Sequence, residues 1–238
     1  MSSRGAGRPR AAEDLRYDNP GIAPLVDQVL PCERRVLDVG CGSGANMEML
    51  RERGHAPVGI TLSEVEARAV ASRGLPCIVG DITAGALPFA PASFDALLFS
   101  HVLEHVAWPE TVLEACARLL KPGGSVYVAL PNVLQFTQRW QFLRGRFRYT
   151  DTGLMDRTHL RFFDLWSARE MVARAGFAPI VSFGVGMCPV GPLRESAPAL
   201  TRRLDRLVSR LLPGLFAVHL VVVGRSAGKP EGAAGCRP

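Results

Sequence analysis

Residues 36–44 read Val-Leu-Asp-Val-Gly-Cys-Gly-Ser-Gly, an apolar run that leads into three alternating glycines and then into a helical pattern. Glycine is needed where the backbone turns sharply or where a ligand must approach the main chain closely. The helix that follows would present free N–H groups and a partial positive charge, which suit a carboxylate or a phosphate. The stretch therefore predicts a ligand-binding turn between a strand and a helix, although a lone glycine triplet is equally compatible with a plain tight turn.

The acidic residue in this stretch, Asp38, distinguishes between two kinds of nucleotide site. A dinucleotide-binding loop has the spacing GxGxxG, and its acid follows about 20 residues later at the end of the second strand. In this chain the third glycine comes one position early, and position 61 carries Thr. A carboxylate beside the loop would repel a pyrophosphate and attract an ammonium group. The residues therefore favour a nucleoside that carries an amino acid over NAD.

Strands and helices alternate along most of the chain. Apolar or alternating runs predict strands at 35–39, 58–62, 76–79, 94–99, 125–130, 177–183 and 215–223. Helical patterns are found at 22–30, 45–53, 64–73, 110–120, 167–175 and 200–212. Strands connected through single helices form parallel sheets whose two faces are covered. The sequence thus predicts an α/β fold with a mainly parallel seven-stranded sheet and helices on both faces.

One domain accounts for most of the 238 residues. Residues 1–18 are rich in Gly, Ser, Arg and Pro and predict a disordered leader, and residues 226–238 predict a flexible tail. Within the domain, 19–225, the alternation breaks at about 133–165 and 185–214, which predicts two insertions. No apolar stretch approaches the roughly 20 residues of a membrane span, and the N-terminus lacks the apolar core of a secretory signal. We therefore expect a cytoplasmic protein.

The charge of the chain is basic, with a net charge of +6 and a pI near 9.3. Lys121 and Lys229 are the only lysines among 28 basic residues, and no run of five like charges occurs. This scattered arginine excess is more typical of composition bias than of phosphate contacts, so we expect no nucleic-acid partner. The six cysteines include no CxxC pair, and we expect no structural zinc or iron–sulfur cluster.

Over about residues 30–225 the chain resembles the class I S-adenosylmethionine-dependent methyltransferases. Residues 36–44 are similar to the first motif of that family, whose glycine loop holds the methionine part of the cofactor. Later landmarks of the family are matched in order by Gly80-Asp81, Ser93-Phe94-Asp95, His101-Val-Leu-Glu104-His105 and Leu120-Lys-Pro-Gly-Gly124. The resemblance implies a Rossmann-like class I methyltransferase fold and S-adenosylmethionine as the cofactor. It places cofactor contacts at Asp38, Gly40, Cys41, Gly42, Gly44, Thr61, Leu62, Asp81, Ile82, Ser100 and His101.

The end of the second predicted strand departs from the family pattern. The family normally has an acid there, which accepts hydrogen bonds from both ribose hydroxyls. The corresponding sequence of this chain is Gly59-Ile-Thr-Leu-Ser63. This segment resembles the corresponding sequence of the cyclopropane-fatty-acid synthase branch, where Thr replaces the acid. A hydroxyl and the nearby backbone can hydrogen-bond a ribose, though more weakly than a carboxylate. We expect Thr61 at the ribose and Ser63 as the N-cap of the next helix.

His101, Glu104 and His105 match the H-x-x-E-H pattern of the inverzincin metalloproteases. Two facts oppose that interpretation: the segment directly follows the fourth predicted strand, and a third zinc ligand is not evident. Some relatives that methylate quinone precursors carry a divalent metal at the equivalent Glu-His, but we predict no metal. His105 is expected in a loop that faces the cofactor, where a catalytic role and plain loop hydrogen bonding carry equal weight.

The first insertion mixes aromatic residues with arginines. Seven aromatic residues and six arginines lie in residues 136–163, and they could either clamp a flat, sugar-like or phosphate-bearing ligand or form a lid over the sheet. Residues 145–163 resemble a subgroup of bacterial methyltransferases associated with cell-surface polysaccharide and glycan assembly. Within it His159 is the expected general base, because imidazole can take a hydroxyl proton near neutral pH. Asp156 is the alternative base or orients His159, and a structural role for this turn carries as much weight.

The predicted helix at 200–212 carries leucines on one face and arginines largely elsewhere. A basic amphipathic helix of this kind could lie on an anionic membrane and reach a lipid-linked acceptor, although packing on the sheet or on a partner is favoured. We expect an enzyme that transfers a methyl group from S-adenosylmethionine to a small-molecule or glycan-type acceptor, at a hydroxyl. The alternatives are C- or N-methylation of a natural-product or quinone-type intermediate, and a non-catalytic cofactor-binding protein.

Overall fold

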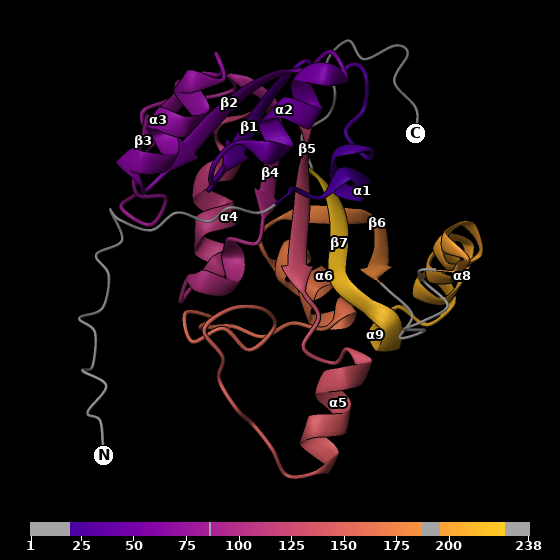
Figure 1. Ribbon diagram of the computed structural model, residues 1–238. Helices are drawn as coiled ribbons and strands as arrows, with labels where there is room; N and C mark the ends of the chain where they lie inside the picture. The colour runs from indigo at the N-terminus through magenta and orange to yellow at the C-terminus, as the bar shows by residue number, and fades with distance from the viewer. Residues whose placement is uncertain (1–19, 86, 187–195, 227–238) are drawn as a thin grey trace, which may run out of the picture.

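A computed structural model describes residues 20–85, 87–186 and 196–226. Seven strands form one sheet in the order β3-β2-β1-β4-β5-β7-β6 (Figure 1). The strand β7 is antiparallel to both of its neighbours, and the other pairs are parallel. The strands are β1 (Arg35–Val39), β2 (Ala56–Thr61), β3 (Cys77–Val79), β4 (Phe94–Ser100), β5 (Leu120–Pro131), β6 (Phe177–Gly186) and β7 (Ala217–Ser226). The predicted seven-stranded, mainly parallel sheet is confirmed.

Helices cover both faces of this sheet, as predicted (Figure 1). On one face lie α1 (Ala23–Val26), α2 (Ala45–Glu52) and α3 (Glu64–Ser72); on the other lie α4 (Pro109–Ala117) and α6 (Leu165–Arg174). The predicted leader, the tail beyond Ser226 and residues 187–195 of the second insertion lie outside the described residues. Among the residues described, no helix has the length and apolar character needed to cross a bilayer.

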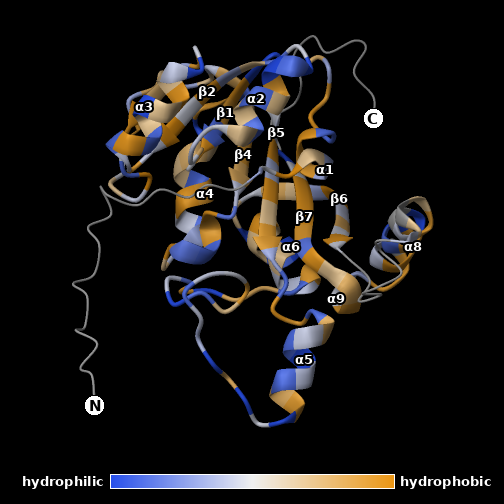
Figure 2. Cartoon of the chain, viewed as in Figure 1, coloured by the Kyte–Doolittle hydropathy of each residue, from blue (hydrophilic) through white to orange (hydrophobic). Residues whose placement is uncertain are grey.

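The central strands are mostly apolar because both of their faces are buried. Successive residues of a strand point to opposite faces, and in β1 Val36 packs with α1 and α2 while Leu37 packs toward α4. In β4, Leu98 and Leu97 divide in the same way. Figure 2 shows this layer of hydrophobic strands between helices of mixed character. Near-continuous apolar runs of this kind are typical of parallel sheets covered on both sides.

The helix α5 (Phe136–Leu143) was not predicted from the sequence. It lies in the first insertion and projects away from the sheet (Figure 1). None of its residues is buried. Phe136, Trp140 and Leu143 stand at the i, i+4, i+7 spacing of one helix face, a pattern that the sequence interpretation missed among the aromatic and basic residues of the insertion.

The helix α8 (Pro198–Leu211) packs against β6 with a polar face. Thr201, Asp205 and Ser209 are buried, whereas Leu200, Leu207 and Leu211 are 58%, 55% and 67% exposed. The predicted amphipathic helix is therefore present, with most of its leucine face turned to solvent. The short helix α9 (Pro213–Phe216) follows, and for this reason β7 begins at Ala217, two residues later than predicted.

Candidate active site

A cavity of about 980 Å³ lies at the carboxyl edge of the parallel strands. Its walls come from the segments that follow β1, β2, β3 and β4, from the first insertion, and from the start of β7. Open α/β sheets bind their ligands at this edge, and a cavity of this size suits a cofactor and a small acceptor. Of the predicted cofactor contacts, the ones that line it are Gly40, Cys41, Gly42, Thr61, Leu62, Asp81, Ile82, Ser100 and His101.

The glycine loop is built as its sequence predicted. Gly40, Gly42 and Gly44 have φ values of 72°, 52° and 87°, which L side chains rarely adopt. A Cβ atom at Gly40 would lie 2.4 Å from Cγ2 of Val102, so a side chain has no room there. Gly44 is the N-cap of α2, and the first residues of that helix, Ala45 and Asn46, line the cavity. The N–H groups of Gly40 and Cys41 donate to the Ile60 carbonyl, and that of Gly44 donates to the Cys41 carbonyl, so the main chain available to a ligand is the start of α2.

Two predicted contacts do not line the cavity, Asp38 and Gly44. Asp38 lies inside β1 between Gly59 of β2 and Leu98 of β4, so the sheet covers it completely. Gly44 packs on α3, where a Cβ atom would lie 3.0 Å from Cγ2 of Val70. Both residues shape the loop from behind.

Asp38 is fully buried, and within the part of the chain that the structure describes neither of its carboxylate oxygens has a hydrogen-bond partner. Burial raises the pKa of this carboxyl to about 7. Buried polar groups are nearly always paired, so an unpartnered carboxylate behind a glycine loop is a place where a cationic group would be stabilised. The residues therefore fit a cofactor that carries an ammonium group.

The carboxylate that is missing from the end of β2 is provided by Glu66 in the first turn of α3. Thr61 Oγ1 donates a hydrogen bond of 2.5 Å to Oε2 of Glu66 in α3. Both residues are buried and both line the cavity. Ser63 Oγ accepts from the Glu66 N–H at 3.3 Å, so the predicted N-cap is confirmed. The sequence interpretation stopped at Thr61 and missed Glu66, although an acid in the first turn of α3 was visible.

The segment after β4 places a carboxylate between imidazoles. Glu104 lies on the short 3-10 helix η2 (Leu103–His105) and is fully buried. His101 Nδ1 lies 3.0 Å from Glu104 Oε1, and His101 Nε2 lies 2.9 Å from Nδ1 of His219 on β7. Glu104 Oε2 has no partner among the described residues. His219 lines the cavity and was not predicted, because its place depends on β7 returning beside β5.

The first insertion folds over this segment. The N–H groups of Leu160 and Arg161 donate to the Glu104 carbonyl at 2.8 and 3.1 Å. Thr158 Oγ1 donates to Asp156 Oδ1 at 2.7 Å and lies 3.0 Å from His105 Nδ1. Because the hydroxyl proton goes to Asp156, His105 Nδ1 must be the donor in the second bond. These bonds hold the predicted catalytic candidates at the cavity wall.

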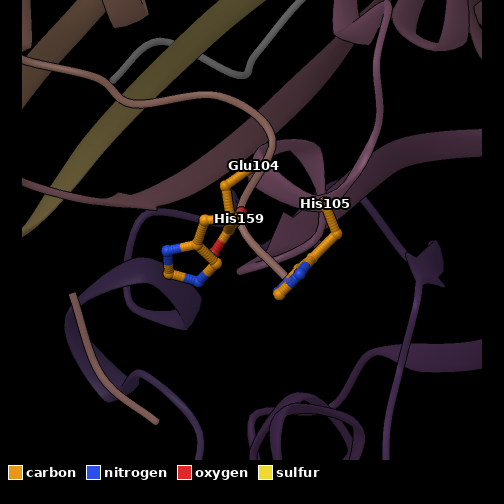
Figure 3. Close-up of side chains that lie close together, drawn as sticks. All are labelled: Glu104, His105 and His159. Atoms are coloured by element: carbon orange, nitrogen blue, oxygen red, sulfur yellow. The ribbon is translucent and has the colours of Figure 1, made fainter. Parts of the chain in front are cut away.

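In both His105 and His159 the Nδ1 atom forms a hydrogen bond to the insertion. His159 Nδ1 donates to the Leu154 carbonyl at 3.1 Å, which leaves Nε2 as an acceptor, as in His105. The two rings meet edge to face with centroids 4.8 Å apart. Burial lowers the pKa of His159, so its imidazole is neutral near pH 7. Figure 3 shows Glu104, His105 and His159 converging from η2 and the insertion.

Asp156 is less suited to take a proton. Burial would raise the pKa of this carboxyl, but hydrogen bonds from the Thr158 N–H and hydroxyl outweigh burial and lower it. A carboxylate that is already satisfied by two donors is a weak base. Asp156 therefore orients the turn that carries Thr158 and His159.

The Glu104, His105 and His159 side chains each offer a ligand-type atom within 4.8 Å of one another. In a tetrahedral zinc site with bonds of 2.0–2.1 Å the ligand atoms lie about 3.4 Å apart. The prediction that no metal binds at this cluster is one that chelation can test.

Residues 37–128 match the family model described as a methyltransferase domain. This range contains the glycine loop, the Thr61–Glu66 pair and the His101–His105 segment. Residues 37–128 are therefore assigned to a methyltransferase domain. Its cofactor is S-adenosylmethionine.

Curated relatives of this methyltransferase domain are named ubiquinone biosynthesis O-methyltransferase. The protein of Paracidovorax citrulli is 36% identical over 125 residues, which cover 50% of this chain and 52% of the relative. The protein of Dechloromonas aromatica is 38% identical over 120 residues, covering 48% and 52%. The chain thus spans about half the length of the curated relatives it matches.

Solved structures share the fold of the methyltransferase domain. A methyltransferase of Archaeoglobus fulgidus superposes with a TM-score of 0.60 at 18% identity, covering 83% of this chain and 88% of its own. The 1,6-didemethyltoxoflavin-N1-methyltransferase of Burkholderia thailandensis, crystallised with its toxoflavin precursor and S-adenosylhomocysteine, gives 0.54 at 19% identity, covering 86% and 77%. At these identities the likeness shows the fold alone.

A second cavity of about 460 Å³ lies beside the main cavity of the methyltransferase domain and shares Leu154 with it. It is lined by residues of α5 and by Arg146 and Arg148 of the loop that follows. Other arginines of the insertion bind the protein itself: Arg157 pairs with Asp151, and Arg161 donates to the Ala107 carbonyl. Arginine in this insertion is therefore partly structural and partly available to a ligand.

Proposed function

We propose that this protein is an O-methyltransferase that methylates a hydroxyl group of a small-molecule acceptor. The observation that carries the proposal is the pair of imidazoles, His105 and His159, which line the same cavity as the glycine loop and are each held at Nδ1 by the insertion. A hydroxyl must lose its proton as it is methylated, and an imidazole that is neutral near pH 7 can accept that proton.

The cofactor would be held along the edge of β1, β2 and β3. The start of α2 and the buried Asp38 carboxyl behind the glycine loop suit the amino-acid part. Thr61 and Glu66 provide a hydroxyl and a carboxylate for the ribose, a stronger acceptor than Thr61 alone. Asp81 Oδ1 accepts from both the N–H and the hydroxyl of Thr83 at 2.7 Å, which fixes the turn proposed to hold the adenine.

When bound, the cofactor would supply an activated methyl group on a sulfonium, whose sulfur would keep the bonding electron pair and leave as a neutral thioether. His159 takes the hydroxyl proton at Nε2, and its Nδ1–H stays on the Leu154 carbonyl. Glu104, fully buried nearby, stabilises the imidazolium that forms. The insertion covers the site and limits water, which helps because the enzyme's main task is to hold the reactants in line.

A phenolic hydroxyl is the acceptor class that we favour. The relatives named above act, by their names, in ubiquinone biosynthesis, and none of those names refers to a glycan. A phenol also loses its proton near pH 10, which an imidazole can assist more readily than the ionisation of a sugar hydroxyl. The predicted glycan-type acceptor therefore serves as the comparison class.

The test combines binding and turnover in the full chain. Calorimetric titration with S-adenosylhomocysteine measures binding, and mass spectrometry follows methylation of a panel of catechols, phenols and sugars. His159→Gln is expected to keep cofactor affinity and to lower kcat for a phenol by about 10²-fold or more, the range for general acid–base catalysis. His105→Gln is the matched variant from the other side of the pair. Binding without methylation of any phenol or sugar would instead support the non-catalytic alternative.

We also propose a peripheral contact for α8. Its exposed leucines stand beside the exposed Arg203 and Arg206, a combination that suits an anionic membrane surface. Such a contact would bring the enzyme close to an apolar acceptor.

A further inference from the structure

We propose that His219 is a second proton acceptor of the site, and that His101 and Glu104 are the positioning residues through which it works. The inference rests on the proposed methylation of a hydroxyl. It is carried by a continuous hydrogen-bonded chain from a buried carboxylate to the cavity: Glu104 Oε1, His101 Nδ1 at 3.0 Å, and His101 Nε2 to His219 Nδ1 at 2.9 Å. No part of the cofactor-binding loop is needed to form this chain.

The direction of the hydrogen bonds follows from the carboxylate end. An ionised Glu104 can only accept, so His101 Nδ1 carries a proton and donates it. In a neutral His101 the Nε2 atom is then an acceptor, and His219 Nδ1 must donate to it. His219 Nε2 is left without a proton. His219 lines the cavity, and no hydrogen bond from this nitrogen to a described protein group is found. An unprotonated imidazole nitrogen is thus offered to the acceptor.

The backbone holds this arrangement under strain. His101 has a φ of 57°, a left-handed conformation that is uncommon for residues other than glycine. Its N–H donates to the Ala129 carbonyl of β5 at 3.0 Å, which fixes the turn after β4. His219 is carried by β7, opposite Pro131 of β5. Strain that the surrounding structure maintains is typical of functional positions, and here it directs the His101 ring between Glu104 and His219.

The hydrogen-bonded chain also explains how the site can take up a proton although a positive charge on His219 is unfavourable. Burial, together with the neighbouring His101, lowers the pKa of His219 to about 4, so a positive charge on His219 itself is unfavourable. When His219 Nε2 takes the hydroxyl proton, its Nδ1 proton can pass to His101 Nε2. One proton enters and one moves across, so His219 stays neutral and the charge lies on His101, beside the Glu104 carboxylate. The stored proton returns by the same route after the product leaves.

Other charged groups also act on this chain. The titratable groups that face His219 are His101 and Glu104. On the far side of Glu104 lie His105 and His159, with Asp156 behind them. Protonation of His159 would weaken the electrostatic attraction between Glu104 and a charged His101. The pair His105 and His159 and the pair His101 and His219 therefore compete for one carboxylate. His219 differs from His159 in being held by a strand of the sheet, and not by the insertion.

The first test reads tautomers in the protein without cofactor. Ring ¹⁵N chemical shifts at pH 7 should show His219 protonated at Nδ1 and bare at Nε2, and His101 protonated at Nδ1. The variant His101→Asn can still donate a hydrogen bond to Glu104, and Asn tolerates the left-handed backbone. It can no longer accept the Nδ1 proton of His219. Wild-type His219 carrying its proton at Nε2 at pH 7 would overturn the proposal.

The second test is kinetic, with cofactor binding as a separate readout. His219→Asn keeps a donor for His101 and removes the Nε2 acceptor. It should lower kcat several-fold, less than His159→Gln does because His159 can still take the proton, with the pH profile shifted and cofactor affinity unchanged. His101→Asn should lower kcat similarly, and the double variant should be no worse than either single one, since the residues act as a unit. A His219→Asn enzyme with wild-type kcat and pH profile would refute the relay. If His159→Gln is impaired at the same time, the proposed function survives that failure.

Discussion

The replacement of Gly40 by Ala tests how the glycine loop is built. Gly40 has a φ of 72°, and the new Cβ would lie 2.4 Å from Cγ2 of Val102. The left-handed conformation costs an alanine about 1–2 kcal/mol. Overpacking against Val102 adds about 1–3 kcal/mol. We therefore expect the free energy of unfolding to fall by about 2–5 kcal/mol, the sum of these two effects.

The chain offers a matched control at Gly54, which follows α2. Its φ is 87°, and a Cβ atom there would meet nothing within 4 Å. Gly54→Ala thus tests the backbone strain alone, and the lower entropy of the unfolded chain offsets about 0.4–1 kcal/mol of that strain. Gly40→Ala should then be the more destabilising by about 1–3 kcal/mol, or about 2–12 °C in Tm for a domain of this size.

Urea unfolding of both variants gives the comparison, and Val102→Ala completes it. Removing the Val102 methyl groups should recover most of the overpacking, so that Gly40→Ala and Val102→Ala together cost less than the sum of the single changes. The expected coupling is about 1–3 kcal/mol. Equal unfolding midpoints for Gly40→Ala and Gly54→Ala, with additive behaviour in the double variant, would refute the close approach of the loop to Val102.

Four further predictions concern the site and its surroundings. The pKa of Asp38 is about 7 in the folded chain against the usual 3.8. The native state therefore keeps this proton to higher pH than the unfolded state, and the free energy of unfolding falls as pH rises between about 4 and 7. In Asp38→Asn, the free energy of unfolding measured in urea should no longer fall over this pH range. Glu66→Gln should weaken S-adenosylhomocysteine binding by about 10-fold in calorimetry, since a charge-assisted hydrogen bond becomes a neutral one, and unchanged affinity would exclude Glu66 from the cofactor site. Dialysis against EDTA should leave kcat unaltered, whereas a loss that divalent cations restore would assign a metal to the Glu104 cluster. Vesicles containing phosphatidylglycerol should sediment the protein at low salt, and Leu207→Ser should reduce the bound fraction; equal binding by the variant would exclude α8 as the contact.

Local chemistry accounts for the features that the sequence predicted well. The alternating glycines of the loop after β1 need left-handed backbone angles, and the apolar strands need burial on both faces, so each pattern is visible in a few neighbouring residues. The same is true of Ser63, whose hydroxyl caps the helix that begins at the next residue. Patterns with such short-range causes can be recognised before the fold is known.

Features with long-range causes were missed or misplaced. His219 joins the site only because β7 enters the sheet between β5 and β6, and it follows His101 by 118 positions. Asp38 was expected to contact the cofactor; it lies fully buried inside β1 and does not line the cavity, and the contact stays a prediction. Register and burial decide these cases, and neither can be recognised from neighbouring residues alone.

The central claim is that this cavity transfers a methyl group to a hydroxyl oxygen. The most direct measurement incubates the full chain with S-adenosylmethionine carrying a ¹³C-methyl group and with a catechol, and follows both products by mass spectrometry and NMR. We predict a ¹³C-methoxy product and an equal amount of S-adenosylhomocysteine, both strongly reduced in His159→Gln. A bound cofactor that stays intact with every phenol offered, or a label found on carbon or nitrogen, would contradict the account.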